Sequence, residues 1–60
     1  MDTHEYMATV NGWTIEKVSG RTKYGAFAFY VISKVHPRHG ECRCKFWSYE
    51  VACEAARADW

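Results

Sequence analysis

Two histidines and two cysteines lie close together in the sequence and have side chains that can bind a metal. The segment "VHPRHGECRCKF" contains His36, His39, Cys42 and Cys44. Structural zinc sites use about four imidazole nitrogens and thiolate sulfurs in a tetrahedron, so the ligand types fit. The spacing fits less well, because such sites commonly take two cysteines from a Cys-x2-Cys turn. We therefore predict no metal and no cofactor, and interpret the cysteines as packed side chains beside exposed histidines.

Basic residues gather in the middle of the chain. Residues 17–45 hold seven Lys and Arg against Glu41 alone, a net charge of +6, whereas the two flanks together carry −5. Cations among aromatic rings on a sheet suit nucleic acid, because the cations meet phosphates and the rings stack on bases. We predict that this face consists of strand residues Arg43, Lys45, Trp47, Tyr30, Lys34 and His36, with Arg21, Lys23 and Arg38 in the loops at its edges.

A protein partner is the alternative, because aromatics with a rim of Arg and Lys are also typical of protein interfaces. For this alternative the expected contact residues are Tyr30, Ile32 and Trp47. A domain of 60 residues buries little surface, so the same residues could join two copies into a homodimer. The sequence leaves the choice between nucleic acid and protein open.

Other functional classes find little support in the sequence. There is no Ser-His-Asp arrangement, phosphate-cradling glycine loop or pair of carboxylates, so we predict a binding protein and not an enzyme. The longest apolar run, residues 26–32, is too short to span a membrane. Three cysteines and an acidic start, "MDTHEYM", do not suggest secretion, and we expect a cytoplasmic protein with reduced thiols.

The elements that must position these residues can be read from turn signals and alternation. Asn11-Gly12 is the favoured pair for a type I′ turn and predicts a hairpin that pairs Val10 with Trp13, Ala8 with Ile15 and Tyr6 with Lys17. The alternative is that residues 1–8 form a loose tail, with disorder expected first in residues 1–5. We expect a basic loop at residues 19–25, a long central strand at residues 26–36, a turn at residues 37–41 and a last strand at residues 42–47.

The last segment, "SYEVACEAARADW", has the pattern of an amphipathic helix. Ser48 is a suitable N-cap, and Glu50 suits the first turn. We expect an alanine-rich side to pack against Cys42, Cys44 and Phe46, with bulk from Trp13, Ile15, Phe27 and Phe29 of the sheet. The predicted fold class is α+β: one domain, residues 1–60, with a three- or four-stranded antiparallel sheet and one C-terminal helix on one face.

This layout resembles a known group of DNA-binding domains. "CRCKFWS" followed by "YEVACEAARADW" resembles the sheet-then-helix arrangement of AP2-type domains and of the arm-binding N-terminal domains of phage integrases, over about residues 13–58. "EVACEAARA" is similar to their E-E-A-A-x-A run. The resemblance implies that the sheet contacts DNA, which carries over to Arg43 and Lys45. The chain departs from these families in its near-neutral charge and in its first loop. Small phage and prophage proteins share the layout, and some of them bind proteins.

Overall fold

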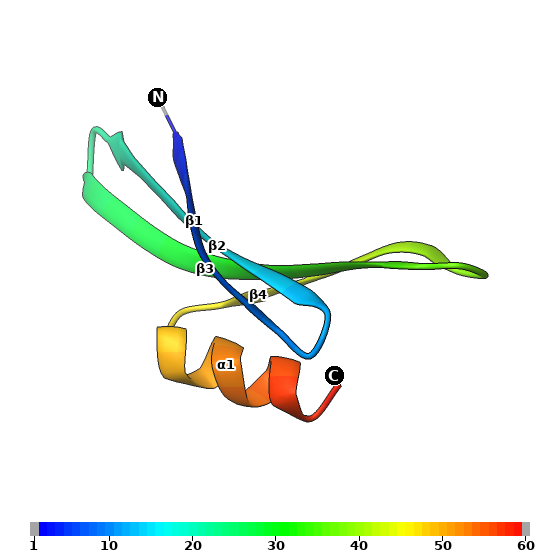
Figure 1. The fold of residues 1–60 in the computed structure, drawn as a ribbon. Coiled ribbons are helices and arrows are strands. Elements are labelled where there is room, and N and C mark those ends of the chain that lie inside the picture. The colour runs from blue at the N-terminus through cyan, green and yellow to red at the C-terminus, as the bar shows by residue number, and fades with distance from the viewer. Residues whose placement is uncertain (1, 60) are drawn as a thin grey trace.

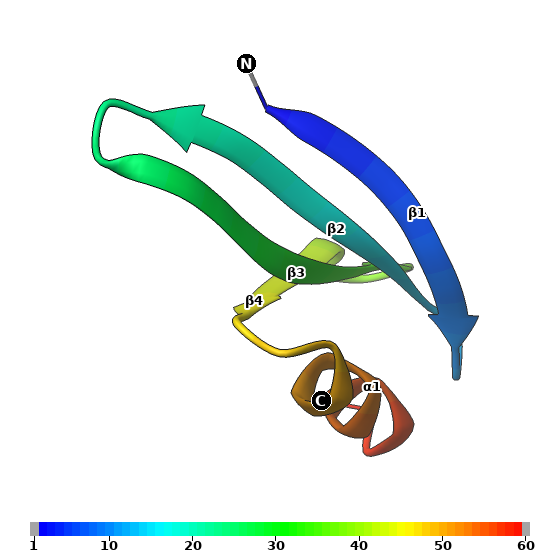
Figure 2. The same cartoon turned by 90° about the vertical axis from the view of Figure 1, so that its left-hand side faces the viewer.

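Four antiparallel strands and one C-terminal helix make up the computed structural model, which describes residues 2–59 (Figure 1). Each strand pairs with its neighbour in sequence, so the sheet order is β1-β2-β3-β4. The helix lies on one face of the sheet (Figures 1 and 2), which confirms the predicted α+β class. The bounds are β1 Thr3–Val10, β2 Trp13–Thr22, β3 Gly25–His36, β4 Gly40–Phe46 and α1 Tyr49–Arg57.

The first hairpin is built on the predicted turn. Asn11 and Gly12 both have positive φ, 51° and 82°, as a type I′ turn requires. The pairs nearest the turn are the predicted ones, Val10 with Trp13 and Ala8 with Ile15. A register shift between Tyr6 and Ala8 then places Tyr6 opposite Glu16, so the predicted pairing with Lys17 is wrong. The β1 strand begins at Thr3, and the structure adopts the full hairpin.

The predicted basic loop at residues 19–25 is wrong, because most of this segment belongs to strands. The β2 strand continues to Thr22 and β3 begins at Gly25, leaving a two-residue turn at Lys23 and Tyr24. The Thr22 hydroxyl oxygen accepts a hydrogen bond from the Tyr24 backbone N–H at 3.1 Å. The same hydroxyl donates to the Gly25 carbonyl at 3.2 Å. These local bonds stabilise a tight turn where composition alone indicated a loop.

The register of β3 with β4 decides which residues lie under the helix. Ile32 is opposite Cys44, and the flanking pairs are Tyr30 with Phe46 and Lys34 with Cys42. Cross-strand partners share a face, so Tyr30, Ile32 and Lys34 lie on the helix side. The prediction that placed Tyr30, Lys34 and His36 on the opposite face is therefore wrong.

The core forms between the small side of α1 and the middle of the sheet. Ile15 and Ile32 are fully buried and directly paired, and Trp13 is only 3% exposed. Ala52 and Ala56 have no exposed surface, because alanine lets the helix backbone approach the sheet closely. Phe27 and Phe29, expected beneath the helix, are not members of this cluster.

Polar contacts fix the end of α1 against the first hairpin. Ser48 occupies the predicted N-cap position without a side-chain capping bond. At the other end, the Asn11 side-chain amide donates to the Ala56 carbonyl at 3.3 Å. The Asp59 carboxylate accepts from the Trp13 indole N–H at 3.0 Å and lies 2.9 Å from Lys34 Nζ. The contacts hold the last turn of α1 through the Ala56 carbonyl, and the chain just beyond it through Asp59, which has a positive φ of 54°.

The Asp59 contacts predict a loss of stability in acid. Hydrogen bonds from Lys34 and Trp13, and the Lys34 charge, hold the pKa of Asp59 below its ordinary value. A lowered folded-state pKa gives stability that is complete above the ordinary aspartate pKa, about 3.9. This stability is lost as pH falls through that value and through the lower folded-state pKa. Thermal unfolding measured from neutral pH downwards should give a smaller acid decrease in Tm for Asp59→Asn than for the wild type. Parallel curves for the two proteins would contradict this account.

Candidate functional site

The sheet face opposite α1 carries a cluster of aromatic rings with apolar and basic neighbours. We call it the aromatic face: Val18, Phe27, Phe29, Arg43, Lys45 and Trp47. The Phe27 and Phe29 rings are stacked, with centroids 6.0 Å apart and an interplanar angle of 11°. Trp47 meets Phe29 edge-on at 5.8 Å and remains 70% exposed. Val18, the cross-strand partner of Phe29, is only 5% exposed. The face is therefore a packed apolar surface with one large, open ring.

Gly20 makes room for the Phe27 ring at the end of this face. A Cβ atom on Gly20 would lie 2.7 Å from Phe27 Cζ and 2.6 Å from Asp2 Oδ1. Both distances are shorter than the non-bonded contacts that a Cβ atom makes in proteins. A side chain at position 20 would therefore displace the Phe27 ring. Gly20 and Phe27 are cross-strand partners, and the ring covers the bare glycine backbone.

The cations of the aromatic face are already engaged. Lys45 Nζ lies 4.9 Å from the Phe29 centroid and 5.0 Å from the Trp47 centroid, within cation–π range of both rings. Arg43 Nε is hydrogen-bonded to the Glu41 carboxylate. Glu16 lies in the same cross-strand row as Lys45 and is 4.0 Å from His4 Nδ1. Positive and negative groups thus alternate around the rings.

Three of the predicted strand residues, Arg43, Lys45 and Trp47, do lie together on the face opposite the helix. The other predicted strand residues lie on the side of the sheet that carries the helix. Ile32 is fully buried and cannot contact a partner. Tyr30 packs against the core, with its ring 5.6 Å from that of Tyr49. Lys34 lies 5.6 Å from the centre of the Trp13 ring and pairs with Asp59, so it stabilises the end of the helix.

The remaining predicted cations are distributed over separate parts of the molecule. Lys23 lies on the β2–β3 turn, 5.2 Å from the centre of the Tyr24 ring. Arg38 lies at the tip of the β3–β4 hairpin, which extends well past α1 in Figure 1. Arg21 is on the helix side of β2, opposite Ala26. Lys23, Arg38 and Arg21 therefore do not join Arg43 and Lys45 in one surface.

Sequence reasoning missed Phe27, Phe29 and Val31 as members of the face opposite the helix. Alternation along the strand identifies the three as one set, but the size of Phe27 and Phe29 predicts, wrongly, that this set lies under the helix. The length of the turn after β3 indicates which residues of β3 share a face with Cys42 and Cys44 of β4. His36 pairs with Gly40, leaving three residues in the loop, and any odd loop length places even-numbered residues of β3 beside even-numbered residues of β4.

The histidines and cysteines of the opening motif make local contacts. His36 Nδ1 accepts backbone hydrogen bonds from Arg38 at 3.1 Å and His39 at 3.4 Å. Cys42 and Cys44 are half-buried beside the core, on the face covered by α1. Among residues 2–59, no three His, Cys, Asp or Glu side chains come together as a metal site would require. On the helix, hydrogen bonding to the buried Cys53 raises the pKa of the Tyr49 phenol.

No helix in the part of the chain that the structure describes is long and apolar enough to cross a membrane. The comparisons with known proteins leave the family open. The resemblance to AP2-type and integrase arm-binding domains stays a prediction from sequence. No protein-family model, curated protein or solved structure matches this chain.

Proposed function

We propose that this chain is a non-enzymatic protein-binding module whose aromatic face contacts the partner. The observation that carries the proposal is the combination of an exposed tryptophan, two ordered phenylalanine rings and balanced charge on one sheet face. Interfaces are enriched in such aromatic anchors, and a few of them supply most of the binding energy. The partner surface should be apolar at its centre and carry both signs of charge at its rim.

The charge of this face argues against the alternative, a nucleic-acid partner. Its two cations, Arg43 and Lys45, are accompanied by three carboxylates, those of Asp2, Glu16 and Glu41. A polyanion is held mainly by cations that neutralise phosphates, so a face without surplus positive charge has little affinity for one. The net charge of +6 in the middle of the sequence is divided between the two sides of the sheet, because strand residues alternate between faces.

Trp47 is the expected centre of the interface. Its ring is 70% exposed, yet its orientation is set by the edge contact with Phe29 and by Lys45. A large ring held in one position loses little conformational entropy on binding, which favours affinity. Val35, 77% exposed and on the same side of the sheet, extends the apolar surface along β3.

Selection of ligands from a random-peptide display library on the immobilised protein tests the proposal. We expect apolar and aromatic peptides whose affinity falls at least tenfold in Trp47→Ala, about 1.4 kcal/mol or more. Phe29→Ala should weaken the same peptides, because Trp47 then loses its supporting ring. Tyr24→Ala is the matched control: Tyr24 is 88% exposed but lies on the β2–β3 turn, and its removal should leave affinity unchanged.

Titration with single-stranded and duplex DNA at low and high salt tests the alternative on the same variants. We expect no salt-sensitive binding that depends on Arg43 or Lys45. Tight DNA binding that weakens with salt and is lost in Arg43→Gln and Lys45→Gln would overturn the proposal. Peptides whose affinity is indifferent to both Trp47 and Phe29 would overturn it as well.

A further inference from the structure

The helix covers only part of its face of the sheet. With nine residues, α1 is about 14 Å long, whereas the molecule extends over 39 Å. Ile32 lies under the helix and is fully buried, but Ala26 and Ala28 on the same side of β3 are exposed. In both ribbon views the β2–β3 hairpin extends away from α1 (Figures 1 and 2). The end of the sheet near this hairpin therefore has no covering layer within the described chain.

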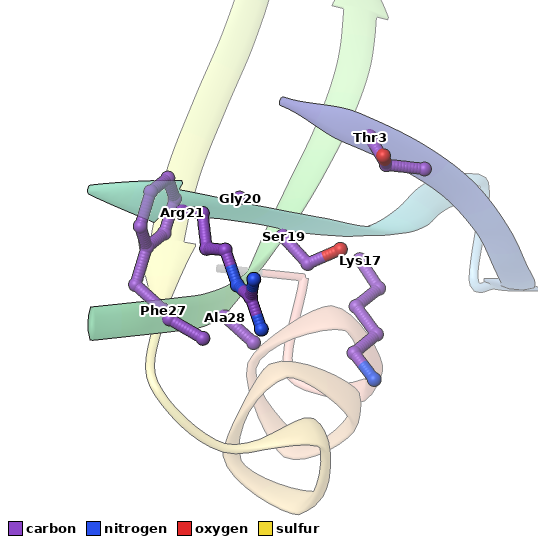
Figure 3. A pocket seen from close by; sticks show the side chains of 8 residues that line it. Thr3, Lys17, Ser19, Gly20, Arg21, Phe27 and Ala28 are labelled. Atoms are coloured by element: carbon purple, nitrogen blue, oxygen red, sulfur yellow. The ribbon is translucent and has the colours of Figure 1, made fainter. Parts of the chain in front are cut away.

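This uncovered end forms a shallow groove of about 530 Å³, which we call the basic groove: Thr3, Lys17, Ser19, Gly20, Arg21, Ala26, Phe27 and Ala28. Its floor consists of small residues, so an element placed on it can approach the backbone closely. Figure 3 shows Lys17 and Arg21 extending from β2 toward the side that carries α1, with Ser19 between them and the Phe27 ring directed the other way. The groove thus has a flat floor with a cation at either side.

The two cations of the groove have no ion-pair partner within residues 2–59. Glu5 is the cross-strand neighbour of Lys17, but the two do not come within ion-pair distance. Arg21 is exposed and opposite Ala26, with no acid beside it on the strand pairs. The groove therefore favours an acidic occupant. Lys17 and Arg21 are four strand residues apart, about 13 Å along β2, and their long side chains can reach carboxylates that lie between them.

The outer side of α1 has the matching properties. Glu50 and Glu54 are both exposed and lie on successive turns, where side chains at i and i+4 are neighbours. Val51, beside the two glutamates, is 47% exposed and offers an apolar contact to a floor of alanines. Arg57 is exposed on the same side, in the last turn, but neither glutamate makes an ion pair in the described chain. The first two turns of α1 thus present an acidic surface with an apolar neighbour, which is complementary to the basic groove.

We propose that two copies of this chain associate through these surfaces, each placing the outer side of α1 in the basic groove of the other. The two helices then lie side by side between two sheets, and each sheet is covered half by its own helix and half by that of its partner. Such an arrangement is isologous and closed, as in most homodimers. Glu50 and Glu54 meet Lys17 and Arg21, and Val51 meets Ala26 and Ala28.

The dimer goes beyond the proposed function and leaves it intact. The aromatic faces lie on the opposite sides of the sheets, so both point outward and the dimer is bivalent. A small domain also gains buried surface that it lacks alone. The dimer differs from the sequence-based expectation of self-association through Tyr30, Ile32 and Trp47, because it uses none of these three residues.

A charge-exchange experiment followed by sedimentation equilibrium tests the dimer. The wild type should be dimeric at low salt. The groove variant Lys17→Glu/Arg21→Glu and the helix variant Glu50→Lys/Glu54→Lys should each dissociate, with dimer affinity lowered at least tenfold, because like charges then face each other. Mixing the two variants should restore a one-to-one heterodimer, since acidic groove meets basic helix and basic groove meets acidic helix. Circular dichroism checks that these exposed substitutions leave the fold intact.

Lys23→Glu/Arg38→Glu is the matched control, because it makes the same change in net charge outside the groove. It should dimerise with itself like the wild type and should bind the helix variant less tightly than the groove variant does, because only one of the two contacts is then complementary. A wild type that stays monomeric at every concentration would overturn the proposal, and so would a mixture no more associated than the control mixture. Peptide binding through Trp47 is measured separately, so either proposal can fail without the other.

Discussion

Replacement of Ile32 by alanine is expected to lower the free energy of unfolding by about 2–5 kcal/mol. Ile32 has no exposed surface, pairs directly with Ile15 and lies beneath the alanines of α1. The whole stability of a domain of this size is only about 3–9 kcal/mol at typical values per residue. The variant should therefore be largely unfolded or close to it, which urea denaturation followed by circular dichroism will show.

Val35→Ala is the matched control for this prediction. Val35 lies on the same strand, on the face opposite the helix, and is 77% exposed, so its loss should change stability by no more than about 0.5 kcal/mol. The pair of variants tests the assignment of faces. A neutral Ile32→Ala with a strongly destabilising Phe27→Ala would indicate that the helix covers the phenylalanine side, as the size of those residues suggests.

Local signals in the sequence predicted most of the elements. Asn11-Gly12 identified the first hairpin and its innermost pairs, because only residues that tolerate positive φ fit a type I′ turn. Ser48 marked the start of α1, and the alternation of Glu50 and Glu54 with alanines identified its two sides. These features depend on neighbours within a few residues, which is why the order of strands and helix follows from them.

The choice of face on β3 failed because both of its faces are apolar. Alternation separates Phe27 and Phe29 from Tyr30 and Ile32, but it does not say which set the helix covers. The size of the phenylalanines suggests that they fill the core. The residues that lie under the helix are instead those that pair across the sheet with Cys44 and Phe46. A loop with an odd number of residues after His36 puts even-numbered residues of β3 and β4 on the same face. Since Cys44 is predicted to lie under the helix, Ile32 follows on the same side.

Three other features of the structure have no counterpart in any local sequence pattern. The register shift between Tyr6 and Ala8 moves Tyr6 to the other face, and nothing at Met7 announces it. The extension of β2 through Gly20 depends on a tertiary contact, because the Phe27 ring covers that glycine. The basic groove likewise results from the short reach of α1 over the sheet. Loop propensity and charge runs describe single segments, so they could not predict surfaces formed by several.

Trp13→Ala should be as damaging as any single change in the core, with an expected cost of about 3–5 kcal/mol. The residue is 3% exposed and joins two kinds of stabilisation: its ring packs in the core cluster, and its indole N–H donates to Asp59 at 3.0 Å. Trp13→Phe keeps most of the apolar contact and removes the donor. Because Asp59 is exposed and retains Lys34, we expect Trp13→Phe to cost clearly less than Trp13→Ala.

A double-mutant cycle with Trp13→Phe and Asp59→Ala separates the two contributions. Chemical denaturation near neutral pH should give a coupling between the two changes, since each removes the same hydrogen bond. The coupling should weaken in acid, once the pH lies below the lowered pKa of Asp59, because a neutral carboxyl accepts a weaker hydrogen bond than a carboxylate. Costs that add without coupling would mean that the hydrogen bond contributes nothing and that Trp13 acts only by filling space. Coupling that is undiminished in acid would assign the effect to a rearranged helix end rather than to the charge of Asp59.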